Sequence, residues 1–219
     1  MTRLKMCGLR DPAHALVAAN AGADLLGFVF VDGVRRQLQV DEGAMVIERY
    51  RERHGPQGPK LVGLFADQPV DFVNRVVATC GLDYVQLCGS EPPEVWDDID
   101  ARVIRQVKVR DDIPHGEAVD EARRKVERAV SAGHMATLDK YHAGSLGGTG
   151  LSFDWEIAAR VASEFEFLLA GGLTSENVAA AIQTARPWGV DVSSGVETDG
   201  IKDPSKIRAF AEAVLKAES

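Results

Sequence analysis

The segment LLAGGLTSEN, residues 168–177, places two glycines between an apolar run and polar residues that can begin a helix. The segment DVSSGVE, residues 191–197, repeats this order near the end of the chain, and GGTG at 147–150 adds a third glycine-rich loop. Glycines let the backbone approach an anion closely, and amide groups at a helix start complement negative charge. One such loop usually only turns the chain, but three in succession predict a phosphate-binding site.

Strand and helix patterns alternate along the rest of the chain, as expected of a parallel sheet covered by helices. We expect strands at residues 3–7, 24–30, 60–66, 84–88, 103–109, 135–139, 165–170 and 189–193. We expect helices near residues 11–21, 41–53, 69–80, 92–100, 116–132, 153–163, 174–184 and 203–217. An open doubly wound sheet is the alternative, but eight strands each followed by a helix favour closure. The predicted fold is α/β, a single (β/α)8 TIM barrel, with one domain over residues 1–219.

The composition is that of an ordinary globular protein, with 45% apolar residues, 26% charged residues and a net charge of −8. The acidic balance disfavours nucleic acid as a partner, and the apolar runs are too short to cross a membrane. Three cysteines without metal-ligand spacing argue against a disulfide framework and a structural zinc. The start, MTRLKMCGLR, lacks the pattern of a secretory signal, so we expect a cytoplasmic protein. Monomer and homodimer both stay open.

Polar residues at the ends of the predicted strands are candidates for chemistry, because barrels of this class keep their active sites there. Alternation along a strand puts Lys5 and Cys7 on one face, and a nearby lysine favours the thiolate form of a cysteine. Asp139 ends the sixth strand and Asp191 lies on the eighth. From spacing alone, Cys7 could instead be an inert buried thiol, and Asp139 could cap the next loop.

A set of motifs runs through nearly the whole chain in a fixed order. They are KMCG (5–8), AGADLLGFVF (21–30), VGLFADQP (62–69), DYVQLCGSE (83–91), TLD (137–139), GGTGLSFDW (147–155), LLAGGLTSENV (168–178) and GVDVSSGVE (189–197). Together they resemble the phosphoribosylanthranilate isomerase family of tryptophan biosynthesis. The resemblance implies an Amadori rearrangement of N-(5-phosphoribosyl)anthranilate to 1-(2-carboxyphenylamino)-1-deoxyribulose 5-phosphate, with no cofactor and no metal.

The same resemblance implies roles for individual residues. Cys7 would be the general base and Asp139 the general acid, as two opposed proton transfers require. Arg36 would meet the anthranilate carboxylate, Asp191 would bind sugar hydroxyls, and Lys5 would join the substrate-binding set. The expected phosphate site consists of backbone amides around Gly148, Gly171, Gly172, Ser193, Ser194 and Gly195.

The chain departs from the family pattern at two places. The family usually reads S-P-R-Y around the arginine, whereas residues 34–37 read VRRQ, so Arg35 could replace Arg36; we favour Arg36. The family's Q-L-H-G is QLCG at 86–89, which puts a second thiol, Cys88, at a strand end. Two alternatives are a histidine-pathway aminoaldose isomerase, which uses two aspartates, and a noncatalytic phosphate-ligand-binding barrel. Cys7 argues against the first, and Cys7 with Asp139 argues against the second.

Overall fold

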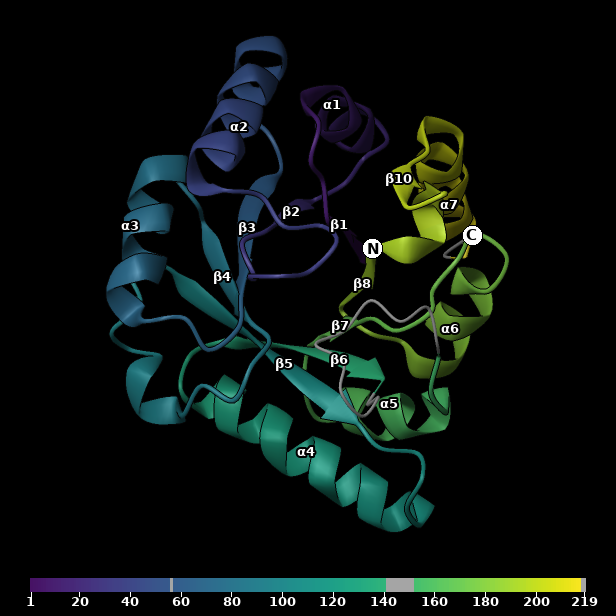
Figure 1. The fold of residues 1–219 in the computed structure, drawn as a ribbon. Coiled ribbons are helices and arrows are strands. Elements are labelled where there is room, and N and C mark those ends of the chain that lie inside the picture. Colours follow the sequence, from purple (N-terminus) through teal and green to yellow (C-terminus); the bar gives the residue numbers. More distant parts are fainter. Residues whose placement is uncertain (56, 141–151, 218–219) are drawn as a thin grey trace.

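The computed structural model describes residues 1–55, 57–140 and 152–217. Eight parallel strands pair in chain order and close into a barrel, because β1 also pairs with β8. They are β1 (Arg3–Cys7), β2 (Leu25–Val29), β3 (Lys60–Phe65), β4 (Tyr84–Leu87), β5 (Arg102–Val109), β6 (Met135–Lys140), β7 (Leu168–Leu169) and β8 (Gly189–Val192). The predicted (β/α)8 barrel is confirmed, and the helices surround the strands in Figure 1.

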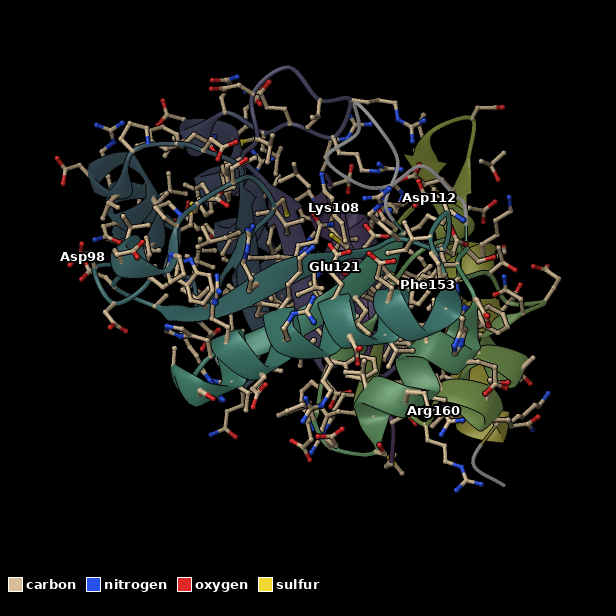
Figure 2. All side chains as sticks on the ribbon, turned by 90° about the horizontal axis from the view of Figure 1, so that it is seen from below. Asp98, Lys108, Asp112, Glu121, Phe153 and Arg160 are labelled. Carbon is tan, nitrogen blue, oxygen red and sulfur yellow. The ribbon has the colours of Figure 1, made fainter. Side chains whose placement is uncertain are left out.

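The helices cover the outside of the barrel. They are α1 (Pro12–Asn20), α2 (Val40–His54), α3 (Val70–Cys80), α4 (His115–Ser131), α5 (Trp155–Ala162), α6 (Val178–Ala185) and α7 (Pro204–Lys216). Two short 3₁₀ turns, η1 (Pro93–Val95) and η2 (Ser194–Val196), and a small hairpin of β9 (Glu197–Thr198) and β10 (Ile201–Lys202) complete the described elements. Figure 2, turned from Figure 1, shows α4 lying along β5, with Glu121 on the helix and Arg160 on the neighbouring α5.

Two helices begin where aspartate–proline pairs stand in the sequence. Asp11 Oδ1 accepts a hydrogen bond from the Ala13 amide at 2.6 Å, and Asp203 Oδ1 accepts one from Ser205 at 2.8 Å. An aspartate oxygen satisfies amide groups that have no partner inside the first helical turn. The helix expected from residue 174 begins only at Val178, because the Asn177 side chain folds back onto the Thr174 amide and the preceding loop.

The helix expected at 92–100 is wrong: the connection contains only the turn η1, followed by further turns. Consecutive prolines at 92 and 93 favour an extended entry and supply no amide hydrogens. The backbone beyond them is held by a side chain instead, since Asn74 donates to the Asp98 carbonyl and accepts from the Asp100 amide. These bonds replace the helical ones, and Trp96 packs in the core without a helix.

The barrel interior contains both a buried apolar cluster and buried polar side chains. Leu25, Val62, Ile104 and Leu168 belong to a buried cluster that also includes Cys7 and Cys88. Six polar side chains on the barrel strands are also buried: Lys5, Gln86, Gln106, Thr137, Asp139 and Asp191. No helix among the described residues is long and apolar enough to cross a membrane. The closed barrel thus brings polar groups from different strands together at one end.

Candidate active site

A cavity opens at the C-terminal ends of the strands. Apolar side chains such as Val29, Val31 and Leu64 form one part of its wall. The sequence-predicted site residues that line it are Cys7, Arg36, Asp139, Gly171, Gly172, Asp191, Ser193 and Ser194. Gly148 lies outside the described residues, and neither Lys5 nor Gly195 belongs to the wall. The structure therefore gathers most of the predicted residues around one space, from β1, β6 and β8 and from the loops after β2, β7 and β8.

Lys5 lies beneath the cavity rather than in its wall. Its side chain is fully buried, and Nζ donates a hydrogen bond to Asp191 Oδ2 at 2.7 Å. Burial alone would lower the pKa of Lys5, but attraction to Asp191 and Cys7 raises it above the ordinary value, so the ammonium group stays charged. Lys5 thus reaches the site through Asp191, which lines the cavity itself.

Cys7 ends β1 and faces the cavity with its side chain buried. Burial raises the pKa of the Cys7 thiol, and attraction to Lys5 and Lys202 only partly offsets that effect. The neighbouring lysine predicted to favour thiolate is present, but the effect of desolvation on the pKa outweighs it. Cys7 is therefore a neutral thiol at rest whose thiolate would be a strong base.

Asp139 ends β6 and is held on both oxygens. Oδ2 accepts a hydrogen bond from Gln106 Nε2 at 3.0 Å, and Oδ1 accepts one from the Lys140 amide at 2.8 Å. Burial, reinforced by repulsion from Asp191, raises the pKa of Asp139 to about 6. A carboxyl group with such a pKa can carry a proton close to neutral pH and donate it. The Lys140 amide still belongs to β6, and the loop that Asp139 could cap lies outside the described residues, but the side chain faces the cavity.

Three cavity residues were not singled out as site residues from the sequence: Gln86, Gln106 and Thr137. In each a polar oxygen is buried without a hydrogen-bond partner within the described part of the chain, and the same holds for Asp191 Oδ1. Buried polar atoms normally have partners, so four unpaired oxygens in one cavity indicate a polar ligand. The signal in the sequence was a glutamine inside each of two apolar strands, YVQL and RVIRQVKV.

Cys88 also lines the cavity, at the end of β4. Burial raises the pKa of its thiol to about 12, and Gln86 Nε2 lies 3.5 Å from its sulfur. Attraction to two lysines, Lys5 and Lys202, offsets part of the effect of burial at Cys7, whereas at Cys88 the hydrogen bond from Gln86 is the largest offsetting contribution. The second thiol is therefore the weaker candidate for a base.

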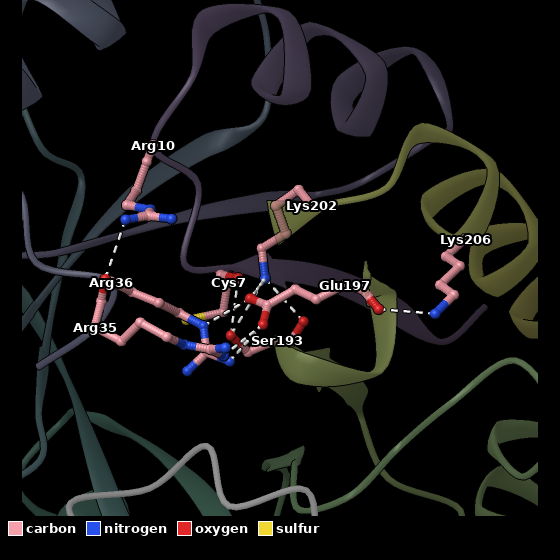
Figure 3. Close-up of polar contacts among 8 residues, drawn as sticks. All are labelled: Cys7, Arg10, Arg35, Arg36, Ser193, Glu197, Lys202 and Lys206. Carbon is pink, nitrogen blue, oxygen red and sulfur yellow. Dashed lines mark hydrogen bonds and ion pairs between the residues drawn. The ribbon is translucent and has the colours of Figure 1, made fainter. Parts of the chain in front are cut away.

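The two neighbouring arginines take different positions, and both contact Glu197 (Figure 3). Arg36 lines the cavity with 13% of its side chain exposed, whereas Arg35 is 55% exposed and stands outside the wall. The geometry favours Arg36 over Arg35 as the cation available to a ligand. The sequence predicts no role for Glu197, because its contacts with the loop after β2 form only in the folded barrel.

The loops after β7 and β8 come close to each other. Gly171 and Gly172 have φ of +90° and +61°, a conformation that favours glycine. A Cβ added at Gly195 would collide with the Leu173 carbonyl oxygen, so this glycine allows the contact between the loops. Ser193 Oγ donates a hydrogen bond to the Cys7 carbonyl at 3.1 Å. The predicted phosphate loops thus form one surface beside Cys7, with Gly195 supporting it from behind.

Comparison with known proteins places the chain in a family. Residues 4–213 match the profile of N-(5'phosphoribosyl)anthranilate (PRA) isomerase. The N-(5'-phosphoribosyl)anthranilate isomerase of Roseiflexus castenholzii is 42% identical over 217 residues, covering 98% of both chains, and that of Geobacter sulfurreducens is 42% identical over 211 residues, covering 96% of this chain and 97% of the other.

Solved structures agree. The phosphoribosyl anthranilate isomerase of Thermotoga maritima superposes with a TM-score of 0.83 at 30% identity, covering 99% of this chain and all of the other. A phosphoribosyl anthranilate isomerase in complex with reduced 1-(o-carboxyphenylamino)-1-deoxyribulose 5-phosphate superposes with a TM-score of 0.80 at 29% identity, with the same coverage. Sequence, fold and site geometry therefore lead to one conclusion: the chain belongs to the N-(5'-phosphoribosyl)anthranilate isomerase family.

Proposed function

We propose that this chain isomerises N-(5'-phosphoribosyl)anthranilate to 1-(2-carboxyphenylamino)-1-deoxyribulose 5-phosphate. The observation that carries the proposal is the presence in one cavity of a buried thiol, Cys7, and a buried carboxyl group, Asp139, whose pKa is raised to about 6. An Amadori rearrangement needs a proton donor at one atom and a proton acceptor at another. The two side chains come from β1 and β6, which lie far apart around the barrel.

Asp139 acts first, as the general acid. It donates its proton to the ring oxygen as the C1–O bond breaks, and the nitrogen lone pair forms the C=N bond of a Schiff base. Cys7 then acts as the base and removes the proton from C2, which the electron-poor imine has acidified. The resulting enolamine tautomerises to the ketone by gaining a proton at C1 and losing the hydroxyl proton at C2. C1 is reduced and C2 oxidised within one molecule, so the reaction balances without a cofactor or a metal.

The resting proton distribution constrains this mechanism. Because the pKa of Cys7 lies above its ordinary value and that of Asp139 is about 6, the pair holds one proton at neutral pH, mainly on sulfur. The reactive form carries that proton on Asp139 and leaves Cys7 as the thiolate. Such a minor form can sustain catalysis because a thiolate with a high pKa is a strong base.

Substrate binding is assigned by chemical complementarity. Arg36 meets the anthranilate carboxylate, since a guanidinium group can bind a carboxylate with two parallel hydrogen bonds. The unpaired oxygens of Gln86, Gln106, Thr137 and Asp191 accept hydrogen bonds from the sugar hydroxyls. Amides of the loops after β7 and β8 hold the phosphate, and Gly148 stays part of this proposal. Lys5 contributes by holding Asp191.

The test is a fluorescence assay of the purified protein with freshly generated phosphoribosylanthranilate. We expect the substrate fluorescence to be lost with the unaltered protein, and to be lost at least about 100-fold more slowly with the Asp139→Asn protein. Activity on the histidine-pathway aminoaldose with none on phosphoribosylanthranilate would overturn the proposal in favour of the related isomerase. Tight substrate binding without turnover would support a noncatalytic phosphate-binding barrel instead.

The remaining expectations complete the proposal. We propose a cytoplasmic protein that forms one domain over residues 1–219 and works as a monomer or a homodimer. A related structure from Thermotoga maritima concerns monomers generated from a dimeric enzyme. Light scattering during size-exclusion chromatography distinguishes the two oligomeric states, and limited proteolysis tests for a single domain.

A further inference from the structure

Glu197, the first residue of the β9–β10 hairpin, binds Arg36 through both carboxylate oxygens (Figure 3). Arg36 Nε donates to Oε1 at 2.7 Å and Nη2 donates to Oε2 at 2.8 Å. The Glu197 side chain is only 5% exposed, so water competes little for this pair. A two-point contact of this kind fixes the plane of the guanidinium group as well as its position.

The Arg36–Glu197 contact occupies only one edge of the guanidinium group. Arginine has five N–H donors, and the bonds to Glu197 use one on Nε and one on Nη2. Both donors on Nη1 and the second donor on Nη2 have no recorded partner among the described residues. That outer edge can bind a second carboxylate with two parallel hydrogen bonds, and Arg36 lines the cavity where the ligand would lie.

Two further cations surround the same carboxylate. Arg35 Nη2 donates to Oε2 at 2.7 Å, and Lys202 Nζ donates to Oε1 at 2.8 Å. Burial alone would raise the pKa of Glu197, but hydrogen bonds from Arg36 and Lys202 lower it to about 2, so the group stays ionised. One negative charge among three positive ones leaves an excess of positive charge beside the cavity, which attracts an anionic substrate.

The cluster also reaches the loop after β8. Lys202 Nζ donates to the Ser193 carbonyl at 2.8 Å, and Ser193 lines the cavity. A Cβ added at Gly8 would lie 2.5 Å from Arg36 Cδ, so the arginine packs directly on the backbone after β1. Arg36 is thus confined by the backbone at Gly8 and oriented by Glu197.

From this geometry we propose that Glu197 is a positioning residue that turns the free edge of Arg36 toward the substrate carboxylate, and so sets the preference for a carboxylate-bearing aromatic amine. The inference rests on the proposed function. Without the Glu197 charge, Arg35, Arg36 and Lys202 would repel one another, and the Arg36 guanidinium would lose its fixed plane. Recognition of the carboxylate would suffer, whereas the proton transfers at the ribose would not.

The test compares Glu197→Gln with the unaltered protein on two substrates, N-(5'-phosphoribosyl)anthranilate and N-(5'-phosphoribosyl)aniline, which lacks the carboxylate. We expect KM for the anthranilate substrate to rise about 10- to 100-fold, the range for losing a hydrogen bond to a charged group. KM for the aniline substrate and kcat for both should change by less than about threefold. In an Arg36→Ala background, Glu197→Gln should add little, because the two residues act as one unit.

Lys206→Ala is the matched control, since Lys206 Nζ donates to the Glu197 backbone carbonyl at 2.8 Å and has no hydrogen bond to a carboxylate oxygen within the described residues. It should leave KM for both substrates unchanged. Equal losses on the two substrates in Glu197→Gln, or no loss on either, would overturn the positioning role. If Glu197→Gln does not fold, Glu197→Asp keeps the charge and should give a smaller rise in KM, again only for the anthranilate substrate. An unaltered protein that turns over neither substrate would count against the proposed function instead.

Discussion

The two ends of the barrel carry the same kind of ion pair in opposite surroundings. At the N-terminal end, Arg3 on β1 binds Asp24 at 2.7 Å, with side chains 55% and 30% exposed. Two residues further along β1, Lys5 binds Asp191 at the same 2.7 Å, with side chains 0% and 8% exposed. Distance therefore does not distinguish the pairs; burial does.

Hydrogen bonding to the second carboxylate oxygen differs as well. Asp24 Oδ2 accepts a hydrogen bond from the Leu4 amide at 2.8 Å. Asp83, which pairs with Lys60, has the same arrangement, because its Oδ2 accepts a hydrogen bond from the Leu61 amide at 2.9 Å. Asp191 Oδ1, by contrast, is buried without a partner in the parts of the chain that the structure describes. At the N-terminal end both oxygens of these carboxylates have hydrogen-bond partners, and the bonds connect neighbouring strands. At the C-terminal end Asp191 has a buried oxygen that a ligand can bind.

The largest expected difference between the two ends concerns activity. Asp139→Asn removes the proton donor, so kcat should fall about 10²- to 10⁴-fold. Asp24→Asn at the other end should leave kcat unchanged. The fluorescence assay measures both, and near-normal turnover in the Asp139→Asn protein would remove this residue from the mechanism.

The same substitution should stabilise the protein at alkaline pH. The pKa of Asp139 is higher in the folded protein than in the unfolded chain. Its contribution to stability is therefore fully present below about pH 4 and is lost as the pH rises through about 6. Asparagine avoids the cost of a buried charge, so the free energy of unfolding at pH 8 should rise by about 1–3 kcal/mol, with a smaller change at pH 4. Urea denaturation at the two pH values checks the sign.

The two thiols at the C-terminal end should differ in their effect on turnover. Cys7→Ser should lower kcat about 100-fold or more, because an alcohol is a far poorer base than a thiolate. Cys88→Ser changes a cavity residue without removing the base, so kcat should stay within about tenfold of normal. The reverse order of effects would show that the base is assigned to the wrong cysteine.

Stability tests the ion-pair comparison directly. Lys5→Met leaves Asp191 charged, buried and unpaired, so the free energy of unfolding should fall by about 3–5 kcal/mol. Arg3→Met breaks an exposed pair of the same length and should cost less than about 1 kcal/mol. Chemical denaturation measures both, and adding Asp191→Asn to Lys5→Met should restore part of the loss. Similar costs for the two single variants would mean that burial is not what separates the two ends.

The smallest expected effect is the fall of kcat/KM on the acid side of its pH profile. Between the pKa values of Asp139 and Cys7 the pair keeps one proton, so kcat/KM should be level there and should fall about tenfold per pH unit below about pH 6. In the Asp139→Asn protein the break near pH 6 should vanish, and the residual kcat/KM should instead rise with pH toward the raised pKa of Cys7, because the thiolate is still the base. A kcat/KM that instead declines as pH rises above 6 would mean that the proton on Asp139 is not shared with Cys7.

Local patterns predicted most of the fold. Eight strand positions followed from short apolar runs, and the helix starts at Asp11 and Asp203 followed from side chains that bond their own neighbours. The predicted helix at 92–100 failed because Asn74, some twenty residues away in sequence, binds that backbone. Such a contact between distant segments leaves no periodic trace in the sequence.

The site residues also fall into those that the sequence could predict and those that it could not. Cys7, Asp139 and the glycine loops stand in motifs that the sequence displays, so their place at the strand ends could be predicted. Gln86, Gln106 and Glu197 were not assigned roles, because their importance depends on which groups face them across the barrel.

The sequence by itself determined the alternation of strands and helices, the capped helix starts and the family motifs, because these depend on neighbours along the chain. Only the tertiary structure decided that Arg36 rather than Arg35 lines the cavity, that Lys5 lies beneath it, and that the pKa values of Cys7 and Asp139 are raised. The physical reason is that desolvation and cross-strand partners exist only after the barrel closes and removes these groups from water.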